Sequence, residues 1–160
     1  IILDPVMVAK SGDSLLADSA IHSLKSLLFT RATLLTPNLP EAAKLVGEGS
    51  AEKQAEALLA LGVGAVLIKG GHADGRTCTD HLFFQTGSQD FSAQRVDTHN
   101  THGTGCSYSS AIAAGLAQGM ALSDAVSRAH AWLHKAILHA DELKGGQGQG
   151  PVHHFHGLWK

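Results

Sequence analysis

The sequence has little cysteine, few charged residues and no long apolar run. Its two cysteines, Cys78 and Cys106, lie too far apart to form a metal-binding pair, which favours a reducing compartment. Charged residues make up 16% of the chain and the net charge is −2, with no basic stripe for nucleic acid and no run of like charges. No apolar segment reaches membrane length and no signal peptide is visible, so we expect no membrane contact and a cytoplasmic location.

The 160 residues contain 44% hydrophobic residues, which is enough for one α/β domain over 1–160. Apolar segments alternate with amphipathic ones, and short connections join them. This alternation predicts a parallel, doubly wound sheet with helices on both faces and a small hairpin. The expected strands are 1–3, 33–36, 65–69, 82–85 and 91–96, and the expected helices are 18–29, 38–45, 50–61, 104–118 and 123–137.

The central stretch of the sequence is a small, polar, glycine-containing loop that leads into an Ala-rich helix near residue 104. Gly103 and Gly105 allow backbone conformations that a Cβ would forbid, and Thr104 and Ser107 are good N-cap types. The first free N–H groups of such a helix form an anion site, with Cys106 at its positive end. The alternative is a helix start whose glycines only allow close packing, because two such glycines alone are a weak signal.

Ligands of doubly wound sheets bind at the carboxyl ends of the strands, and polar residues stand at those positions here. Asp4 follows the first strand, Asn38 and Glu41 follow the second, and Lys69 ends the third. Carboxylates, a lysine and an anion-binding helix start are typical of phosphoryl transfer, in which the protein positions and neutralises charge.

Each of these residues also has a purely structural interpretation. Asn38 and Glu41 have the spacing of a capping box, and Asp4 before Pro5 can form a turn. Lys69 at the end of a buried strand needs a partner, which is either a ligand phosphate or a structural salt bridge. His102 is expected to be a loop histidine, and the histidines of the tail to be packed or exposed rather than metal ligands.

Four segments, 3–12, 36–42, 68–72 and 100–106, resemble in sequence and order the bacterial hydroxymethylpyrimidine/phosphomethylpyrimidine kinases of the ribokinase superfamily. The tail 150–156 also resembles the C-terminus of this family, so the resemblance covers the whole chain. Related pyridoxal kinases share the fold and the Asn-x-x-Glu element. The Gly-Thr-Gly-Cys turn at 103–106 separates the two groups, and most ribokinase relatives carry Asp where Cys106 stands.

The resemblance implies phosphorylation of 4-amino-5-hydroxymethyl-2-methylpyrimidine by MgATP, and then of its monophosphate to the diphosphate, in thiamine biosynthesis. It implies a role in catalysis for Lys69 and for an anion hole formed by Gly103, Thr104, Gly105 and Cys106. ATP would be bound by Asn38, Glu41, Lys69, Thr98, Gly103 and Gly105. Asp4 and Glu41 would bind Mg²⁺, and Val6 and Cys106 would contact the pyrimidine.

The first half of the family's sequence is absent, so we expect a C-terminal, nucleotide-binding portion that is a poor kinase by itself. Its expected partners are the missing N-terminal half and a second copy in a homodimer. Three alternatives stay open. They are a pyridoxal or pyridoxine kinase, a nucleotide-binding fragment without turnover, and an enzyme whose nucleophile is Cys106, activated by the helix dipole and His102.

Overall fold

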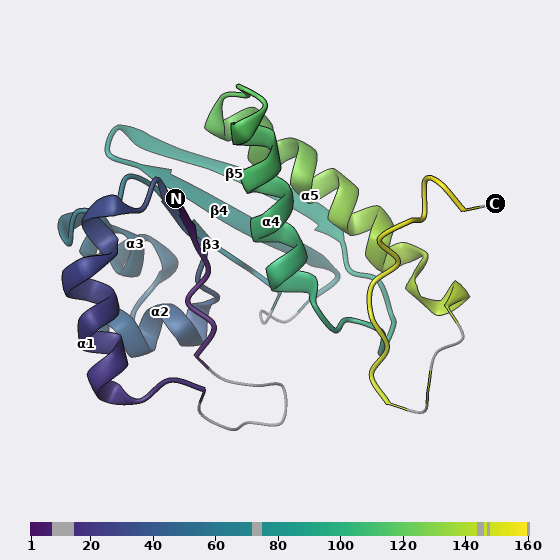
Figure 1. Cartoon of the computed structure of the whole chain (residues 1–160), viewed down its shortest axis with the longest axis horizontal. Helices are drawn as coiled ribbons and strands as arrows, with labels where there is room; N and C mark the ends of the chain where they lie inside the picture. The colour runs from purple at the N-terminus through teal and green to yellow at the C-terminus, as the bar shows by residue number, and fades with distance from the viewer. Residues whose placement is uncertain (8–14, 72–74, 144–145, 147, 160) are drawn as a thin grey trace. The chain divides into compact units, whose positions relative to one another are not determined.

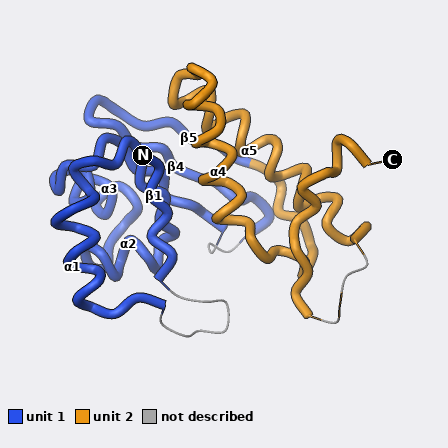
Figure 2. Tube along the Cα trace, viewed as in Figure 1, with its two compact units in different colours: residues 1–92 blue, residues 93–160 orange. Residues whose placement is uncertain are grey.

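A computed structural model describes residues 1–7, 15–71, 75–143, 146 and 148–159 (Figure 1). The chain forms two compact units, Ile1–Ser92 and Ala93–Lys160 (Figure 2), and each is described by itself. Parts of two of the family-like segments, 8–12 and His72, lie outside the described residues.

A five-stranded sheet forms the centre of the first unit, with its strands in the order of the sequence. The strands are β1 (Ile2–Leu3), β2 (Leu34–Leu35), β3 (Val66–Ile68), β4 (Thr77–Phe84) and β5 (Gly87–Gln94). β1, β2 and β3 run parallel, whereas β4 is antiparallel to β3. The sheet is therefore mixed, with a parallel part extended by the hairpin. The hairpin begins at Thr77 rather than at residue 82, and the part of β4 that pairs with β3 is His81–Phe83.

The helices of the first unit are α1 (Asp18–Leu27), α2 (Leu39–Val46) and α3 (Ala51–Ala60), with a 3₁₀ turn η1 (Phe29–Arg31) after α1. α2 begins at the expected capping box. The Asn38 side chain accepts a hydrogen bond from the Glu41 N–H at 2.8 Å, and Glu41 Oε2 accepts one from the Asn38 N–H at 2.8 Å. Asp18 is the first residue of α1 rather than its cap. Its negative charge at this position interacts favourably with the helix dipole.

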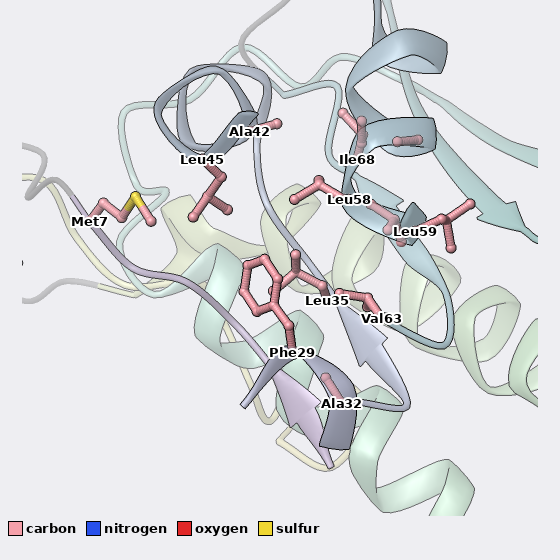
Figure 3. Close-up of a cluster of buried hydrophobic side chains, with 12 residues drawn as sticks. Met7, Phe29, Ala32, Leu35, Ala42, Leu45, Leu58, Leu59, Val63 and Ile68 are labelled. Carbon is pink, nitrogen blue, oxygen red and sulfur yellow. The ribbon is translucent and has the colours of Figure 1, made fainter. Parts of the chain in front are cut away.

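A cluster of buried apolar side chains packs the helices of this unit against its parallel strands. Figure 3 shows Phe29, Leu35 and Val63 gathered at its centre, and the first two are fully buried. Full burial of one such side chain contributes roughly 1.5–3 kcal/mol. β3 is buried along its whole length, as its continuous apolar sequence predicts. This core fixes the strand ends after which the candidate site residues lie.

The second unit contains α4 (Thr104–Ala117), α5 (Leu122–Leu138) and a 3₁₀ turn η2 (Ala140–Glu142). α4 and α5 pack on each other through the buried residues Tyr108, Ile112, Val126, Ala129 and Leu133. α5 begins one residue before the expected cap Ser123. The C-terminal tail returns to the start of α4, where Pro151 pairs with His102. No helix in the described ranges combines the length and the apolar character that a membrane crossing needs.

Candidate functional site

Asp4, Glu41 and Lys69 form an acid–lysine cluster in the first unit. The Lys69 ammonium Nζ lies 2.9 Å from Asp4 Oδ1 and 4.0 Å from Glu41 Oε2. The three side chains are mostly buried, with 15%, 12% and 8% of their surface exposed for Lys69, Asp4 and Glu41. They follow three adjacent parallel strands, so the structure brings together residues that are far apart in the sequence.

Backbone pairing places the lysine of this cluster. The Lys69 N–H donates to the Pro37 carbonyl at 2.9 Å, and Lys69 continues the parallel pairing of β2 and β3 opposite Asn38. The Thr36 hydroxyl donates to Asp4 Oδ1 at 3.0 Å, so this oxygen accepts from both Thr36 and Lys69. The salt bridge named as one alternative for Lys69 is therefore present. It leaves Lys69 with further N–H donors for a ligand, because an ammonium has three.

Burial raises the pKa of the Glu41 carboxyl above its ordinary value of 4.5. The Asn38 N–H and the Lys69 charge act in the opposite direction, and the Asp4 charge adds to the increase. A desolvated carboxylate beside a second carboxylate is stabilised by any further cation that approaches.

Two carboxylates suit a magnesium ion that arrives with a nucleotide. Mg²⁺ is usually bound by one or two carboxylates together with phosphate oxygens and waters. Among the described residues there is no group of three or more side chains that could hold a metal by themselves. The donor set of Asp4 and Glu41 therefore fits Mg²⁺ held jointly with phosphates, and not a metal held by protein ligands alone.

Gly70, which follows Lys69, lets the backbone pass very close to the hairpin strand β4. Its N–H donates to the buried Asp80 carboxylate at 2.8 Å, and a Cβ at this position would lie 1.9 Å from the Thr79 carbonyl oxygen. Only glycine fits there. Asp80 is not among the residues expected from the sequence, where its signal is no more than an acidic residue within a strand.

The start of α4 is the second candidate region and lies in the second unit. Gly103 is the N-cap with φ of +80°, and the Ser107 N–H makes the first intrahelical bond, to the Gly103 carbonyl at 2.9 Å. The N–H groups of 104–106 therefore have no acceptor within the helix, which is the arrangement that binds anions. The loop and helix are as expected from the sequence.

Three details at this helix start differ from the expectation. Gly105 lies inside α4 without a positive φ, so only Gly103 needs the left-handed conformation. Thr104 and Ser107 are not caps. The Thr104 hydroxyl donates to the Thr101 carbonyl at 2.6 Å, and the Ser107 hydroxyl is bonded to the His154 ring at 2.7 Å. The glycine at 103 removes the need for a capping side chain.

A pocket of about 430 Å³ opens beside this helix start, lined by Cys106, Ser107, Ser110, Ala111, Trp132 and His154. The Cys106 residue is exposed and its thiol is free of a disulfide. Within the described part of the chain, no histidine hydrogen-bonds the Cys106 thiol, and the His154 ring is bonded to Ser107 instead. The described surroundings of Cys106 therefore lend no support to the cysteine-nucleophile alternative.

Two other predicted site residues lie in loops. Val6 follows β1, is 37% exposed, and its N–H donates to the Asp4 carbonyl at 2.9 Å. Thr98 lies in the second unit, where its hydroxyl donates to Asp141 and accepts from the Asn100 N–H at 3.1 Å. Thr98 therefore belongs to the hydrogen-bond network of the loop before α4, and its contact with ATP stays a prediction.

The profile of the family described as phosphomethylpyrimidine kinase matches residues 1–153. The chain belongs to this family. A hydroxymethylpyrimidine/phosphomethylpyrimidine kinase of Rhizobium meliloti is 50% identical over 165 aligned positions, which cover 99% of this chain and 62% of that relative. The chain thus spans less than two thirds of the length of this relative.

Solved structures of kinases share the fold. The ADP complex of Bacillus subtilis pyridoxal kinase is 30% identical with a TM-score of 0.85, and the match covers 96% of this chain and 60% of that one. A phosphomethylpyrimidine kinase from Clostridium difficile is 33% identical with a TM-score of 0.70, over 85% of this chain and 56% of that one. The ribokinase-like fold expected from the sequence is confirmed.

Proposed function

We propose that this chain carries the nucleotide-binding portion of a kinase that phosphorylates 4-amino-5-hydroxymethyl-2-methylpyrimidine and then its monophosphate, with ATP, in thiamine biosynthesis. The observation that carries the proposal is the acid–lysine cluster at the ends of three parallel strands, in a chain of the phosphomethylpyrimidine kinase family. The Rhizobium meliloti relative is named for this pair of substrates, and the Bacillus subtilis kinase structure holds ADP.

In this proposal each group acts by its charge or its N–H donors. Lys69 contacts the ATP phosphates while Asp4 keeps its ammonium in place. Asp4 and Glu41 would hold Mg²⁺, which would neutralise phosphate charge when bound. Asn38 keeps Glu41 oriented through the capping box and has its amide N–H₂ left for the nucleotide.

The first turn of α4 would stabilise the transferred phosphoryl group. Gly103 orients the N–H groups of Thr104, Gly105 and Cys106, which have no acceptor within the helix. A preorganised backbone donor of this kind contributes roughly 2.7–4 kcal/mol to a transition state on which negative charge develops. Val6 and the Cys106 thiol are proposed to contact the pyrimidine, and Thr98 to lie near the nucleotide.

The test is a phosphoryl-transfer assay on the full-length protein that contains this chain. ADP release with MgATP is measured with the pyrimidine alcohol, with its monophosphate and with pyridoxal, and each product is identified by mass. We expect the monophosphate and the diphosphate of the pyrimidine, formed faster than pyridoxal phosphate. Faster turnover of pyridoxal would favour the function named for the Bacillus subtilis structure, and no ATP-dependent product would refute the kinase proposal.

The 160-residue chain by itself is proposed to bind nucleotide with little turnover, since it spans 62% of its relative. ADP with Mg²⁺ should raise its unfolding temperature, because a ligand that binds only the folded state stabilises it. Phosphorylation by the isolated, monomeric chain at the rate of the full-length protein would contradict this part of the proposal.

We further propose a homodimer in the cytoplasm, with residues 1–160 acting as one domain. Large apolar side chains that are exposed, such as Leu27, Leu138 and Trp159, support self-association. A chain with only two cysteines, far apart in the sequence, fits a reducing compartment. Light scattering of the full-length protein tests the dimer, since a monomer at micromolar concentration would refute it.

A further inference from the structure

The side chain of Asn100 connects the loop before α4 to two segments that come much later in the sequence. Its Oδ1 accepts a hydrogen bond from the Gly150 N–H at 2.8 Å, and its Nδ2 donates to Asp141 Oδ1 at 2.8 Å. Its own N–H donates to the Thr98 hydroxyl, which in turn donates to Asp141. Thr98, Asn100, Asp141 and Gly150 are called the Asn100 clamp below.

Backbone bonds extend the same connection towards the helix. The His102 N–H donates to the Gly150 carbonyl at 3.0 Å, and the Val152 N–H donates to the His102 carbonyl at 3.4 Å. The Thr104 hydroxyl closes the last step by donating to the Thr101 carbonyl at 2.6 Å. The loop that enters α4 is therefore held by η2 and by the tail, and not only by its own sequence.

Gly150 shows how closely the tail approaches Asn100. A Cβ on Gly150 would lie 2.4 Å from Asn100 Oδ1 and 2.9 Å from Asn100 Cγ. A side chain at position 150 would therefore displace the side-chain amide of Asn100, to which the Gly150 N–H is bonded. The geometry depends on glycine at one end of the bond and on a side chain with both an acceptor and a donor at the other.

We propose that Asn100 and Asp141 are positioning residues for the anion-binding start of α4. This proposal rests on the kinase function proposed above. Gly103, the N-cap, makes no side-chain cap hydrogen bond, so the position of the first turn of α4 depends on the loop that carries Gly103. The Asn100 clamp fixes that loop, and neither residue is required to touch the phosphate.

A positioning role predicts a large effect on turnover and a small one on folding. Asp141 is exposed, and exposed polar contacts contribute little to the free energy of unfolding. In contrast, a displacement of about 1 Å in a group that orients a reacting substrate can lower the rate about 100-fold.

The experiment uses the full-length protein with the variants Asn100→Ala and Asp141→Ala, both together, and the exchange Asn100→Asp with Asp141→Asn. In the exchange variant, the carboxylate introduced at position 100 still accepts from the Gly150 N–H. It also accepts a hydrogen bond from the amide at position 141, so the direction of that bond is reversed. The control is Glu142→Gln, the neighbouring carboxylate on η2, which bonds His139 at 2.6 Å.

We measure kcat/KM for ATP, the alkylation rate of Cys106 mapped by mass spectrometry, and the unfolding temperature. We expect the single Ala variants to lower kcat/KM about 10- to 100-fold and to change the Cys106 rate severalfold. The unfolding temperature should change little for Asp141→Ala and fall more for Asn100→Ala, because the Gly150 N–H then loses its partly buried acceptor. The double Ala variant should be no worse than the worse single one, because the two residues act as a unit. The exchange variant should recover most of the wild-type kcat/KM and most of the wild-type Cys106 alkylation rate. Glu142→Gln should match wild type in both.

Additive effects of the two Ala variants, failure of the exchange to recover, or an equal effect of Glu142→Gln would overturn the positioning role. The Cys106 alkylation rate reports the loop geometry without catalysis. If the wild-type protein transfers no phosphate, the proposed function fails, and the same pattern in the alkylation rates still decides whether the Asn100 clamp sets the geometry of the α4 start.

Discussion

Lys69 Nζ lies 2.9 Å from Asp4 Oδ1, although the two residues are 65 positions apart in the sequence. Lys69 follows β3 and Asp4 follows β1, and β2 lies between these strands in the sheet. Both side chains are mostly buried, and removal of one partner from a buried pair leaves the other charge uncompensated. The lysine therefore serves the fold as well as the proposed chemistry.

Lys69→Ala should weaken the use of ATP more than binding of the pyrimidine. A hydrogen bond from a charged donor contributes roughly 1.5–3 kcal/mol, so kcat/KM for ATP should fall about tenfold or more. The variant should also unfold at a lower temperature, because Asp4 and Glu41 then lie close together without their cation. Steady-state kinetics and a thermal unfolding curve of the full-length protein measure the two effects.

The matched control is Lys53→Ala on α3, whose side chain is exposed. This variant removes the same charge from the same unit and should leave both kcat/KM and unfolding temperature near wild type. An unchanged kcat/KM for ATP in Lys69→Ala would reject its phosphate role, while the loss of stability would still support the salt bridge.

Glu41→Gln should make the protein more stable at neutral pH. Burial raises the pKa of the Glu41 carboxyl in the folded state above 4.5, so the folded state binds this proton more tightly than the unfolded state. Stability in wild type therefore falls as pH rises from 4.5 through the folded-state pKa, and this contribution is absent in Gln. Urea unfolding from pH 4 to pH 7 should show the advantage of the variant growing with pH.

Glu52→Gln is a control, because the pKa of Glu52 is shifted in the opposite direction to that of Glu41. The hydrogen bond from the Ser50 side chain lowers the pKa of this exposed carboxyl, so it favours the folded state at pH values above 4.5. The Gln variant should therefore have no stability advantage at pH 7. A Glu41→Gln advantage that stays constant across the pH range would contradict the assignment to ionisation.

Much of the acid–lysine cluster could be predicted from sequence because parallel strands align their carboxyl ends. Asp4, Asn38 and Lys69 each stand directly after an apolar segment, and the spacing of Asn38 and Glu41 predicted the capping box. These signals are local. They point to one site because the carboxyl ends of parallel strands lie at the same edge of the sheet.

The parts that could not be predicted depend on contacts between distant segments. Asp80 is recognisable only once β4 lies beside β3 and its carboxylate meets the Gly70 N–H. Asn100 meets Asp141 and Gly150 across 41 and 50 positions. The sequence also predicted left-handed freedom for both Gly103 and Gly105, whereas the helix begins between them and needs it only at Gly103.

Gly70→Ala should destabilise the protein much more than Gly71→Ala. A Cβ at Gly70 would lie 1.9 Å from the Thr79 carbonyl oxygen, whereas one at Gly71 meets no atom within 4 Å. Forced overpacking typically costs about 1–3 kcal/mol, occasionally more, and here it would also displace the Gly70 bond to Asp80. Unfolding curves of the two variants make the comparison, and equal midpoints would refute the close approach.

Gly103→Ala should lower turnover more than Cys106→Ser does. Gly103 has φ of +80°, and an L-residue in the left-handed region costs about 1–2 kcal/mol, so alanine should shift the loop and with it the N–H groups of the first α4 turn. Loss of one such donor costs roughly 2.7–4 kcal/mol in the transition state. Cys106→Ser keeps every backbone donor, and a loose phosphoryl-transfer transition state needs little help from a base, so it should retain most activity.

Gly119→Ala separates backbone strain from catalysis. Gly119 follows the other end of α4 with φ of +86° and no atom within 4 Å of an added Cβ, so alanine there carries the same strain as at Gly103. Both glycine variants should lose similar stability, and only Gly103→Ala should lose kcat, measured in the full-length protein at saturating MgATP. If Cys106→Ser were inactive while Gly103→Ala kept its turnover, the thiol and not the backbone of the α4 start would be the essential group.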